Sequence, residues 1–210
     1  MISILVQGFL ISGGLIVAIG AQNAFILRQG LLGEKVFYVC ALCFFCDAAL
    51  ISLGVLGVGS VLQQSPFFLN ALAIFGAAFL YWYGCQSFYR AYRGNSHLHI
   101  GHQGSKQQTL TKLLLTTLAI TLLNPHVYLD TLVIIGGIGA TLGGEEKRWF
   151  LVGSLFASFV WFFGLGYASK KLIPYFESSR TWVVLDSIIG VVMCWIATGL
   201  AAFVYQNLAS

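Results

Sequence analysis

Apolar residues fill six long stretches of this chain, and most polar residues are confined to the short segments between them. A helix needs about 20 apolar residues to cross the hydrocarbon core of a bilayer. Every stretch is long enough, so the pattern predicts six transmembrane helices in an all-α polytopic membrane protein. The uncharged or nearly uncharged stretches are 2–27, 36–62, 66–89, 113–140, 149–169 and 181–207.

The longest polar segment, residues 90–112, divides the chain into two halves. The halves cover about 1–89 and 113–207, and each contains three of the predicted helices. With an odd number of crossings per half, the second half enters the membrane from the opposite side, as in an inverted-topology repeat. We therefore predict a single transmembrane domain over 1–210, built as a 3+3 inverted repeat.

Polar residues interrupt the first helix of each half. The first interruption is at 20–23 (GAQN), and the second is at 124–130 (NPHVYLD). Pro125 lacks a backbone donor and clashes with the preceding turn of a helix. Freed backbone groups are tolerated at membrane depth where they line a cavity, and paired interruptions point to a transporter's binding site. We therefore predict that helices 1 and 4 are broken, at Gly20 and Pro125.

The composition agrees with a membrane protein. Hydrophobic residues make up 58% of the chain and charged residues only 9%, whereas a soluble domain carries about 25% charged residues. The first charged side chain is Arg28, so the basic segment of a secretory signal is missing and we expect helix 1 to be retained. The net charge of +4 lies in short loops, where it indicates orientation and not nucleic-acid binding.

Basic residues are distributed unevenly between the two sides of the predicted bundle. The side opposite the 90–112 loop carries only Lys147 and Arg148. The positive-inside rule therefore places the 90–112 loop in the cytoplasm and both termini outside. Two alternatives stay open: a broken first helix could put Arg28 inside the membrane, and a five-span arrangement would reverse one terminus. The basic residues on the loop side are Arg28, Lys35, Arg90, Arg93, Lys106, Lys112, Lys170, Lys171 and Arg180.

Two carboxylates, Asp47 and Asp130, lie inside the apolar stretches. A charged residue at mid-membrane depth costs about 2.5–3.5 kcal/mol on insertion scales, so each indicates a functional site. Asp130 follows His126 by four residues, which puts both on one helix face. Asp47 shares a face with Cys40 and Cys43, a weakly polar stripe that suits a helix facing a cavity. The alternative is that both acids are protonated and only join neighbouring helices.

Other polar residues near the breaks are candidates for the same site. Gln22 and Asn23 could contact a substrate, or could equally satisfy backbone groups where helix 1 breaks. Asn124 adds an amide near Asp130, and Tyr128 is a weaker candidate because a single tyrosine in a helix usually serves packing. The predicted substrate- and proton-binding residues are Asp47, Asp130, Gln22, Asn23, Asn124, His126 and Tyr128.

All five cysteines lie in apolar stretches. The spacing of Cys40, Cys43 and Cys46 resembles metal or redox motifs, but free cysteine is also an ordinary small hydrophobe. No matching thiol pair occurs in the second half. The histidines of the 90–112 loop are interpreted as incidental residues of a solvated loop and not as zinc ligands. We therefore predict no metal site and no cofactor. Two rival functions stay open, a thiol–disulfide electron conduit and a divalent-metal exporter that uses the two acids and His126.

Three segments resemble the lysine/arginine exporter family, of the LysE type. They are GAQNAFILRQG (20–30), NPHVYLDT (124–131) and KRWFLVGSLFASFVWFFGLG (147–166). The resemblance extends over essentially the whole chain and is nearest to the arginine-exporter branch. The chain departs from the family pattern at Ala21, where the family usually has proline.

The resemblance implies a secondary transporter, not an enzyme, that exports basic amino acids such as L-arginine across the bacterial inner membrane. L-lysine stays open as a second substrate. It also implies that Asp47 and Asp130 correspond to the family's intramembrane acids. The residues that match the family's paired helix breaks are Gln22, Asn23, Asn124 and Pro125.

Charge balance predicts how such export would be driven. Moving one positive charge out against an inside-negative potential costs about 2.3 kcal/mol per 100 mV. Returning one proton per exported cation cancels this cost, and a carboxylate that binds either a proton or the substrate provides the exchange. We therefore predict proton antiport, with a small cationic amino acid, protons and membrane lipids as partners. No nucleic-acid partner is expected, and a homodimer is left open.

Overall fold

The computed structural model describes residues 1–17, 20–33, 35–56, 66–93, 109–176 and 179–209. These ranges are almost entirely helical and contain no β-strand, which confirms the predicted all-α class. Residues 94–108, with most of the predicted polar loop and its three histidines, lie outside the described residues. The helices are α1 (Ile2–Ile16), α2 (Ala21–Leu32), α3 (Val36–Val55), α5 (Pro66–Arg93), α6 (Leu110–Leu122), α7 (Pro125–Tyr128), the π-helix η1 (Leu129–Ile135), α8 (Gly136–Ala140), α9 (Gly144–Ala168), the 3₁₀-helix η2 (Ser169–Phe176) and α10 (Ser179–Ala209).

Several of these helices are long and apolar enough to cross a membrane. In the described part of the chain, three single helices are long and apolar enough: α3, α9 with its extension into η2, and α10. Two bent pairs, α1 with α2 and α6 with 126–140, bring the number of candidate spans to as many as five. The remaining predicted span lies in α5, a 28-residue helix that is not among these five.

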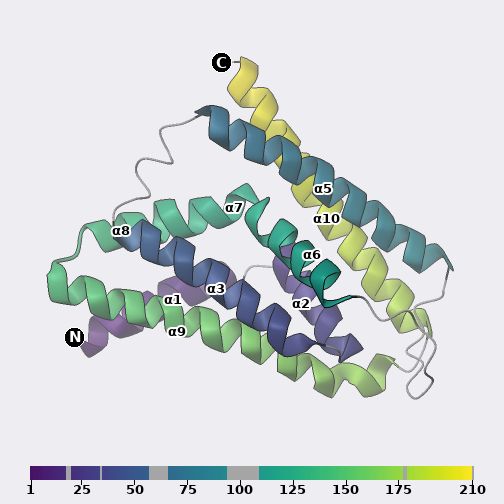
Figure 1. The fold of residues 1–210 in the computed structure, drawn as a ribbon, viewed down its shortest axis with the longest axis horizontal. Helices are drawn as coiled ribbons and strands as arrows, with labels where there is room; N and C mark the ends of the chain where they lie inside the picture. The colour runs from purple at the N-terminus through teal and green to yellow at the C-terminus, as the bar shows by residue number, and fades with distance from the viewer. Residues whose placement is uncertain (18–19, 34, 57–65, 94–108, 177–178, 210) are drawn as a thin grey trace.

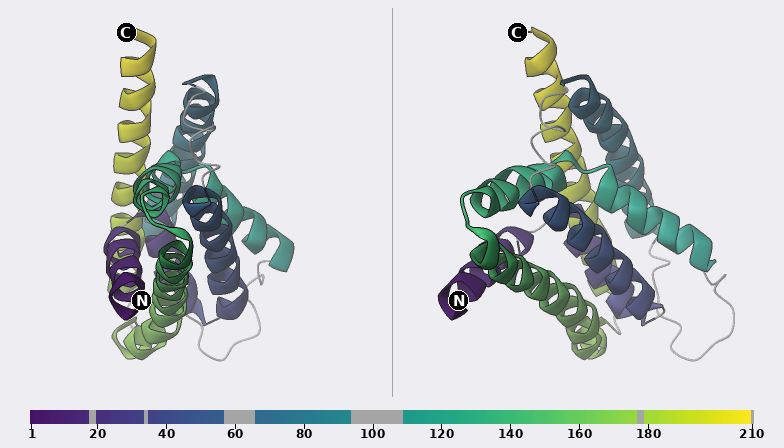
Figure 2. Two further views of the ribbon diagram at one scale, coloured as in Figure 1. Left: turned by 90° about the vertical axis from the view of Figure 1, so that its left-hand side faces the viewer. Right: turned by 60° about the vertical axis from the view of Figure 1, so that its left-hand side comes forward.

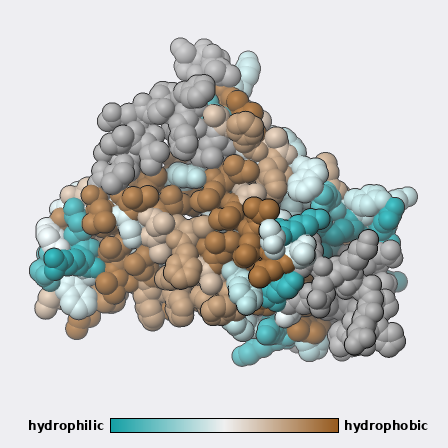
Figure 3. All heavy atoms as spheres, in the orientation of Figure 1, coloured by the Kyte–Doolittle hydropathy of each residue, from teal (hydrophilic) through white to brown (hydrophobic). Residues whose placement is uncertain are grey.

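The surface carries an apolar band between two polar ends. Figure 3 shows hydrophobic residues across the middle of one face and hydrophilic residues gathered towards both ends of the long axis. Large apolar side chains point outward along the bundle, such as Phe45 of α3, Phe156 of α9 and Val191 of α10. Contiguous apolar surface of this kind is unfavourable in water and suits contact with lipid tails.

The helices of the two halves pack in a reciprocal pattern. The first half's α1 packs against α9 of the second half, and α6, η1 and α8 of the second half pack against α3 of the first. The helices α3 and α9 also pack against each other, and α5 pairs with α10. Each bent helix therefore lies on the second helix of the other half, as Figure 1 shows for α1 and α9.

The α5–α10 pair is attached to the rest of the molecule over only part of its length. Each of these two helices packs mainly against the other. The smaller contacts of α10 are with α2 and η2, and those of α5 are with α6 and α7. Towards the C-terminus, the pair projects away from the remaining helices in Figures 1 and 2.

Candidate functional site

The first helix break lies between α1 and α2, whose axes bend by 83°. Helix α1 ends at Ile16, and α2 begins after Gly20, which is extended (φ −122°, ψ 176°). The side-chain amide of Asn23 donates from Nδ2 to the carbonyl oxygen of Ile16 at 2.7 Å, and Trp161 Nε1 donates to Asn23 Oδ1 at 3.1 Å. Asn23 therefore satisfies a backbone group that the break frees, one of the two roles expected for it.

The second break, between α6 and α7, has a similar arrangement and a bend of 63°. Helix α6 ends at Leu122 and α7 begins at Pro125. The Tyr128 hydroxyl donates to the carbonyl oxygen of Leu122 at 2.9 Å, and Asn124 Oδ1 accepts from the backbone N–H of His126 at 3.1 Å. At both breaks, then, a side chain six or seven residues further along binds the last carbonyl of the interrupted helix.

A cavity of about 290 Å³ lies between the two breaks. This volume is near the lower end of the range of about 300–1,000 Å³ that small-molecule sites occupy. The cavity brings together six of the seven predicted binding residues and Gly20, while Tyr128 is not among its described lining residues. The lining residues are Leu15, Ile16, Gly20, Gln22, Asn23, Asp47, Asn124, His126, Val127, Asp130, Thr131, Phe162, Trp195 and Ile196.

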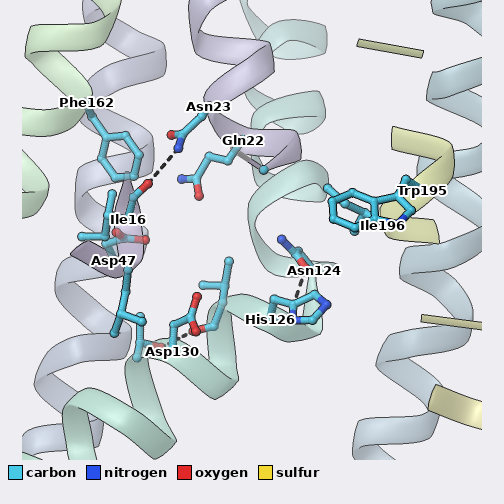
Figure 4. Close-up of a pocket in the computed structure, with 14 residues that line it drawn as sticks. Ile16, Gln22, Asn23, Asp47, Asn124, His126, Asp130, Phe162, Trp195 and Ile196 are labelled. Atoms are coloured by element: carbon cyan, nitrogen blue, oxygen red, sulfur yellow. Dashed lines mark hydrogen bonds between the residues drawn. The ribbon is translucent and has the colours of Figure 1, made fainter. Parts of the chain in front are cut away.

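Asp47 and Asp130 reach this cavity from different helices. Asp47 of α3 is only 3% exposed, and its Oδ2 accepts a hydrogen bond from the Ser158 hydroxyl of α9 at 3.2 Å. Asp130 is half-buried on η1. Neither carboxylate forms an ion pair with another described residue. Figure 4 shows both acids among the side chains around the cavity, below Gln22 and to one side of His126.

A π-helix carries Asp130. The segment Leu129–Ile135 continues directly from α7 into α8, and Thr131 Oγ1 donates to the carbonyl oxygen of Val127 at 2.6 Å. Segments of π-helix are rare and often occur at functional sites, because the extra residue per turn redirects side chains. Both His126 and Asp130 line the cavity.

Gln22 differs from its neighbour Asn23. Its side chain lines the cavity, and its Nε2 is buried without a hydrogen-bond partner in the described part of the chain. An unpaired buried amide is unfavourable, and a bound ligand could satisfy it. Gln22 is therefore the amide of the pair that is available to a ligand.

The cysteine stripe on α3 does not face the cavity. Cys40 is buried and its thiol donates to the carbonyl oxygen of Phe162 at 3.2 Å, and Cys43 is fully buried in the same apolar core. Of the residues on this predicted face, only Asp47 lines the cavity, because the thiols pack against protein. All five cysteines are free. The described residues also contain no group of three His, Cys, Asp or Glu side chains placed to hold a metal.

A third acid in an apolar stretch, Asp186, is not among the site residues predicted from the sequence. Its side chain on α10 is fully buried, and its Oδ1 accepts from Nε of Arg28 at 3.2 Å and from Nε of Arg90 at 3.3 Å. Asp186 lies in the apolar stretch 181–207, so the signal that identified Asp47 and Asp130 was present there as well. Ser158 and Trp161, the α9 partners of Asp47 and Asn23, carry no such signal.

Comparison with known proteins places the chain among translocators. Residues 14–203 match the family model for the LysE type translocator. The chain is 40% identical over 201 residues to the arginine exporter protein ArgO of Salmonella enteritidis and to that of Salmonella typhimurium, covering 96% of this chain and 94% of each relative. Identity to the arginine exporter protein ArgO of Salmonella newport is 39% over the same length. No solved structure matches the chain.

The family match covers most of the chain, and the relatives match over nearly their whole length. The family match and the apolar helices described above together identify a multi-pass membrane protein. The resemblance seen at the helix breaks is confirmed: the chain belongs to the LysE type translocator family.

Proposed function

We propose that this chain exports basic amino acids across the bacterial inner membrane, with L-arginine as the favoured substrate and L-lysine as a second one. The observation that carries the proposal is the pair of acids, Asp47 and Asp130, in one cavity with no cation from a described residue paired to either. Intramembrane acids normally have a partner, and a cationic substrate would supply one here. Similarity to arginine exporters supports the same substrate class.

The polar groups of the cavity match the groups of an amino acid with a cationic tail. Asp47 and Asp130 offer charge-assisted hydrogen bonds to the guanidinium and the α-ammonium. The substrate carboxylate needs donors, and Gln22 Nε2 is available for it. The N-terminal end of α2 lies beside Gln22, where the helix dipole favours an anion and Gly20 contributes no capping side chain.

The packing of the two halves supports a 3+3 inverted repeat. Exchanging the halves exchanges α1 with α6 and α3 with α9, and it leaves the α3–α9 and α5–α10 contacts in place. Substrate sites of such transporters lie near the midplane, between discontinuous helices. The cavity between the two breaks has the corresponding position in this chain.

Proton antiport follows from the charge of the substrate. An exported cation leaves behind acids in a site of low dielectric, and a returning proton would neutralise one of them. Because Asp47 is almost fully buried and its hydrogen-bond partner in the described part of the chain is the Ser158 hydroxyl, proton binding and substrate binding would exclude each other there. We propose one proton returned per cation exported.

Substitution of the two acids tests the proposal directly. We expect Asp47→Asn and Asp130→Asn each to lower efflux of labelled L-arginine from proteoliposomes by about 10- to 100-fold. This corresponds to loss of a hydrogen bond to a charged group, about 1.5–3 kcal/mol. Glu145→Gln, at an exposed acid in the first turn of α9, is the matched control and should leave efflux unchanged. Full efflux from both variants, correctly inserted, would remove the acids from the mechanism.

The two rival functions are decided by separate measurements. A variant with all five cysteines replaced by alanine should still export arginine, whereas an electron conduit would lose its activity. For the metal exporter, a deletion strain should become sensitive to divalent metals. We expect instead that the deletion strain becomes sensitive to toxic arginine analogues.

A further inference from the structure

The ion cluster of Arg28, Asp186 and Arg90 joins three helices. Arg28 belongs to α2, Arg90 to α5 and Asp186 to α10. The Asp186 side chain is 0% exposed, and those of Arg28 and Arg90 are 15% and 26% exposed. Ser87 accepts a further hydrogen bond from Nη2 of Arg90 at 2.6 Å. The carboxylate of the cluster is therefore shielded from solvent, and the two arginines are partly exposed.

An aromatic contact lies beside the cluster and joins two of the same helices. The guanidinium carbon of Arg90 is 5.5 Å from the ring centroid of Tyr83 on α5. The Tyr83 ring packs edge-on against Phe25 of α2, with centroids 6.0 Å apart. Both aromatic side chains are buried. The cluster thus lies beside buried aromatic side chains that join α2 to α5.

The cluster is displaced from the cavity towards one end of the bundle. On α2, Arg28 follows the cavity residue Asn23 by five residues, or about 7 Å along the helix. On α10, Asp186 precedes the cavity residue Trp195 by nine residues, or about 13 Å. Both displacements lead towards the end of α5 at Arg93, the end from which 94–108 continues, at the right of Figure 1. The sequence predicts that this end is cytoplasmic.

The two bonds to Asp186 connect different parts of the fold. Arg90–Asp186 lies within the α5–α10 pair, whereas Arg28–Asp186 joins that pair to α2. Helix α2 begins at the first break and lines the cavity through Gln22 and Asn23, and α10 lines it through Trp195 and Ile196. The Arg28–Asp186 bond therefore joins two helices that both line the cavity, at a level between the cavity and the predicted cytoplasmic end.

We propose that Arg28 and Asp186 form an ion-pair gate that closes the cytoplasmic approach to the cavity, and that the gate opens when α2 separates from the α5–α10 pair. The inference rests on the proposed export function, because a substrate leaving the cell must first enter the cavity from the cytoplasm. Arg90 stays bound to Asp186 in the open form, so the buried carboxylate is never left without a cation. Arg28 and Asp186 act as positioning residues and need not touch the substrate.

Access of a thiol reagent to the cavity tests the gate. The parent is the cysteine-free variant with Val127→Cys, a cavity-lining position whose side chain has no polar group to lose. Inside-out and right-side-out vesicles are treated with a membrane-impermeant maleimide, and the labelling rate is measured without any amino acid. We expect Arg28→Gln to raise the rate from the cytoplasmic face by about tenfold, which equals about 1.4 kcal/mol in the closed–open equilibrium. The rate from the outer face should not rise.

Three further variants separate a gate from general loosening. Arg28→Lys keeps the charge and should label like the parent, and Arg90→Gln leaves the Arg28–Asp186 bond intact and should also do so. Arg148→Gln breaks the exposed pair with Glu145 and is the matched control for loss of an ion pair. Arg28→Met, which fills a similar volume without charge, replaces Arg28→Gln if the latter fails to insert.

The gate proposal is contradicted if the cysteine at position 127 is labelled at the parent rate in the Arg28→Gln or Arg28→Met variant. It is also contradicted if the labelling rate rises equally from both faces. Equal increases in the Arg28→Gln and Arg90→Gln variants would also overturn it, because the cluster would then serve only stability. These outcomes do not depend on which solute the cavity takes. The proposed function is tested separately by efflux from Asp47→Asn and Asp130→Asn.

Discussion

Gln22 and Asn23 carry the same amide group in adjacent positions, yet their hydrogen bonding differs. Asn23 is bonded to the Ile16 carbonyl and to Trp161, so it joins the end of α1 to α2 and α9. Gln22 Nε2 has no partner in the described part of the chain. One side chain therefore stabilises the break, and its neighbour is free to bind a ligand.

Alanine substitutions at these two positions should separate stability from binding. Asn23→Ala leaves a backbone carbonyl and an indole N–H without a bond, and we expect a loss of about 1–3 kcal/mol for each buried group left unpaired. Gln22→Ala removes an Nε2 donor that has no partner among the described residues, so we expect little change in stability but a higher KM for arginine efflux. Thermal unfolding in detergent and efflux kinetics measure the two effects. A stable Asn23→Ala protein, or an unstable Gln22→Ala protein, would contradict this assignment.

At the scale of elements, the position of Asp130 depends on close contact between α3 and the segment formed by η1 and α8. Gly54 of α3 and Gly136 of α8 face each other, and a Cβ built on Gly136 would lie 2.8–2.9 Å from Gly54 backbone atoms. Any larger residue at either position forces the two backbones apart. The small residues therefore determine how deeply η1 and its acid lie against α3, which carries Asp47.

Adjacent glycines in α8 provide a direct test of this contact. Gly136→Ala should be destabilised by about 1–3 kcal/mol through overpacking, and we expect slower arginine efflux because Asp130 moves with η1. Among the described residues, no atom outside its own helix turn lies within 4 Å of the Gly137 Cβ position, so Gly137→Ala should be neutral or more stable by up to about 1 kcal/mol. The melting temperatures of the two variants in detergent decide between them. Equal melting temperatures would show that the close approach of Gly136 to Gly54 does not restrict the size of the side chain at position 136.

At the scale of the whole molecule, the ends of the apolar band differ in charge. Figure 3 shows hydrophilic residues at both ends, but nine of the eleven basic residues belong to the loop-side set defined from the sequence, and Lys147 and Arg148 are the other two. This asymmetry predicts that the start of α6 faces the cytoplasm and the start of α9 faces the outside.

Single cysteines at the two ends test this orientation. In the cysteine-free chain, Thr111→Cys at the start of α6 should react with an impermeant maleimide only in inside-out vesicles. Glu146→Cys at the start of α9 should react only in right-side-out vesicles or intact cells. Both positions are exposed and neither is basic, so the substitutions leave the charge asymmetry in place. The reverse labelling pattern would mean that the cavity and the proposed gate face opposite sides from those given above.

Much of the fold was predictable because it depends on local composition. Long apolar stretches separated by polar segments determine where helices form in a bilayer, and the all-α class was confirmed. The bends between α1 and α2 and between α6 and α7 lie at the polar interruptions, since glycine and proline act on their own backbone. The helix start at Leu110 and the helix end at Arg93 shorten the polar loop expected over 90–112. The six-span, 3+3 arrangement stays a prediction.

The sequence by itself determined the membrane class, the translocator family and the identity of two acids, because a charge inside an apolar stretch is visible without knowledge of its neighbours. Only the tertiary structure decided what each polar group contacts. It paired Asp186 with Arg28 and Arg90, over 158 and 96 residues of sequence, and it bonded Asn23 to Trp161 while leaving Gln22 Nε2 unpaired. The physical reason is that such contacts form between helices distant in sequence, and residue spacing along one helix carries no information about them.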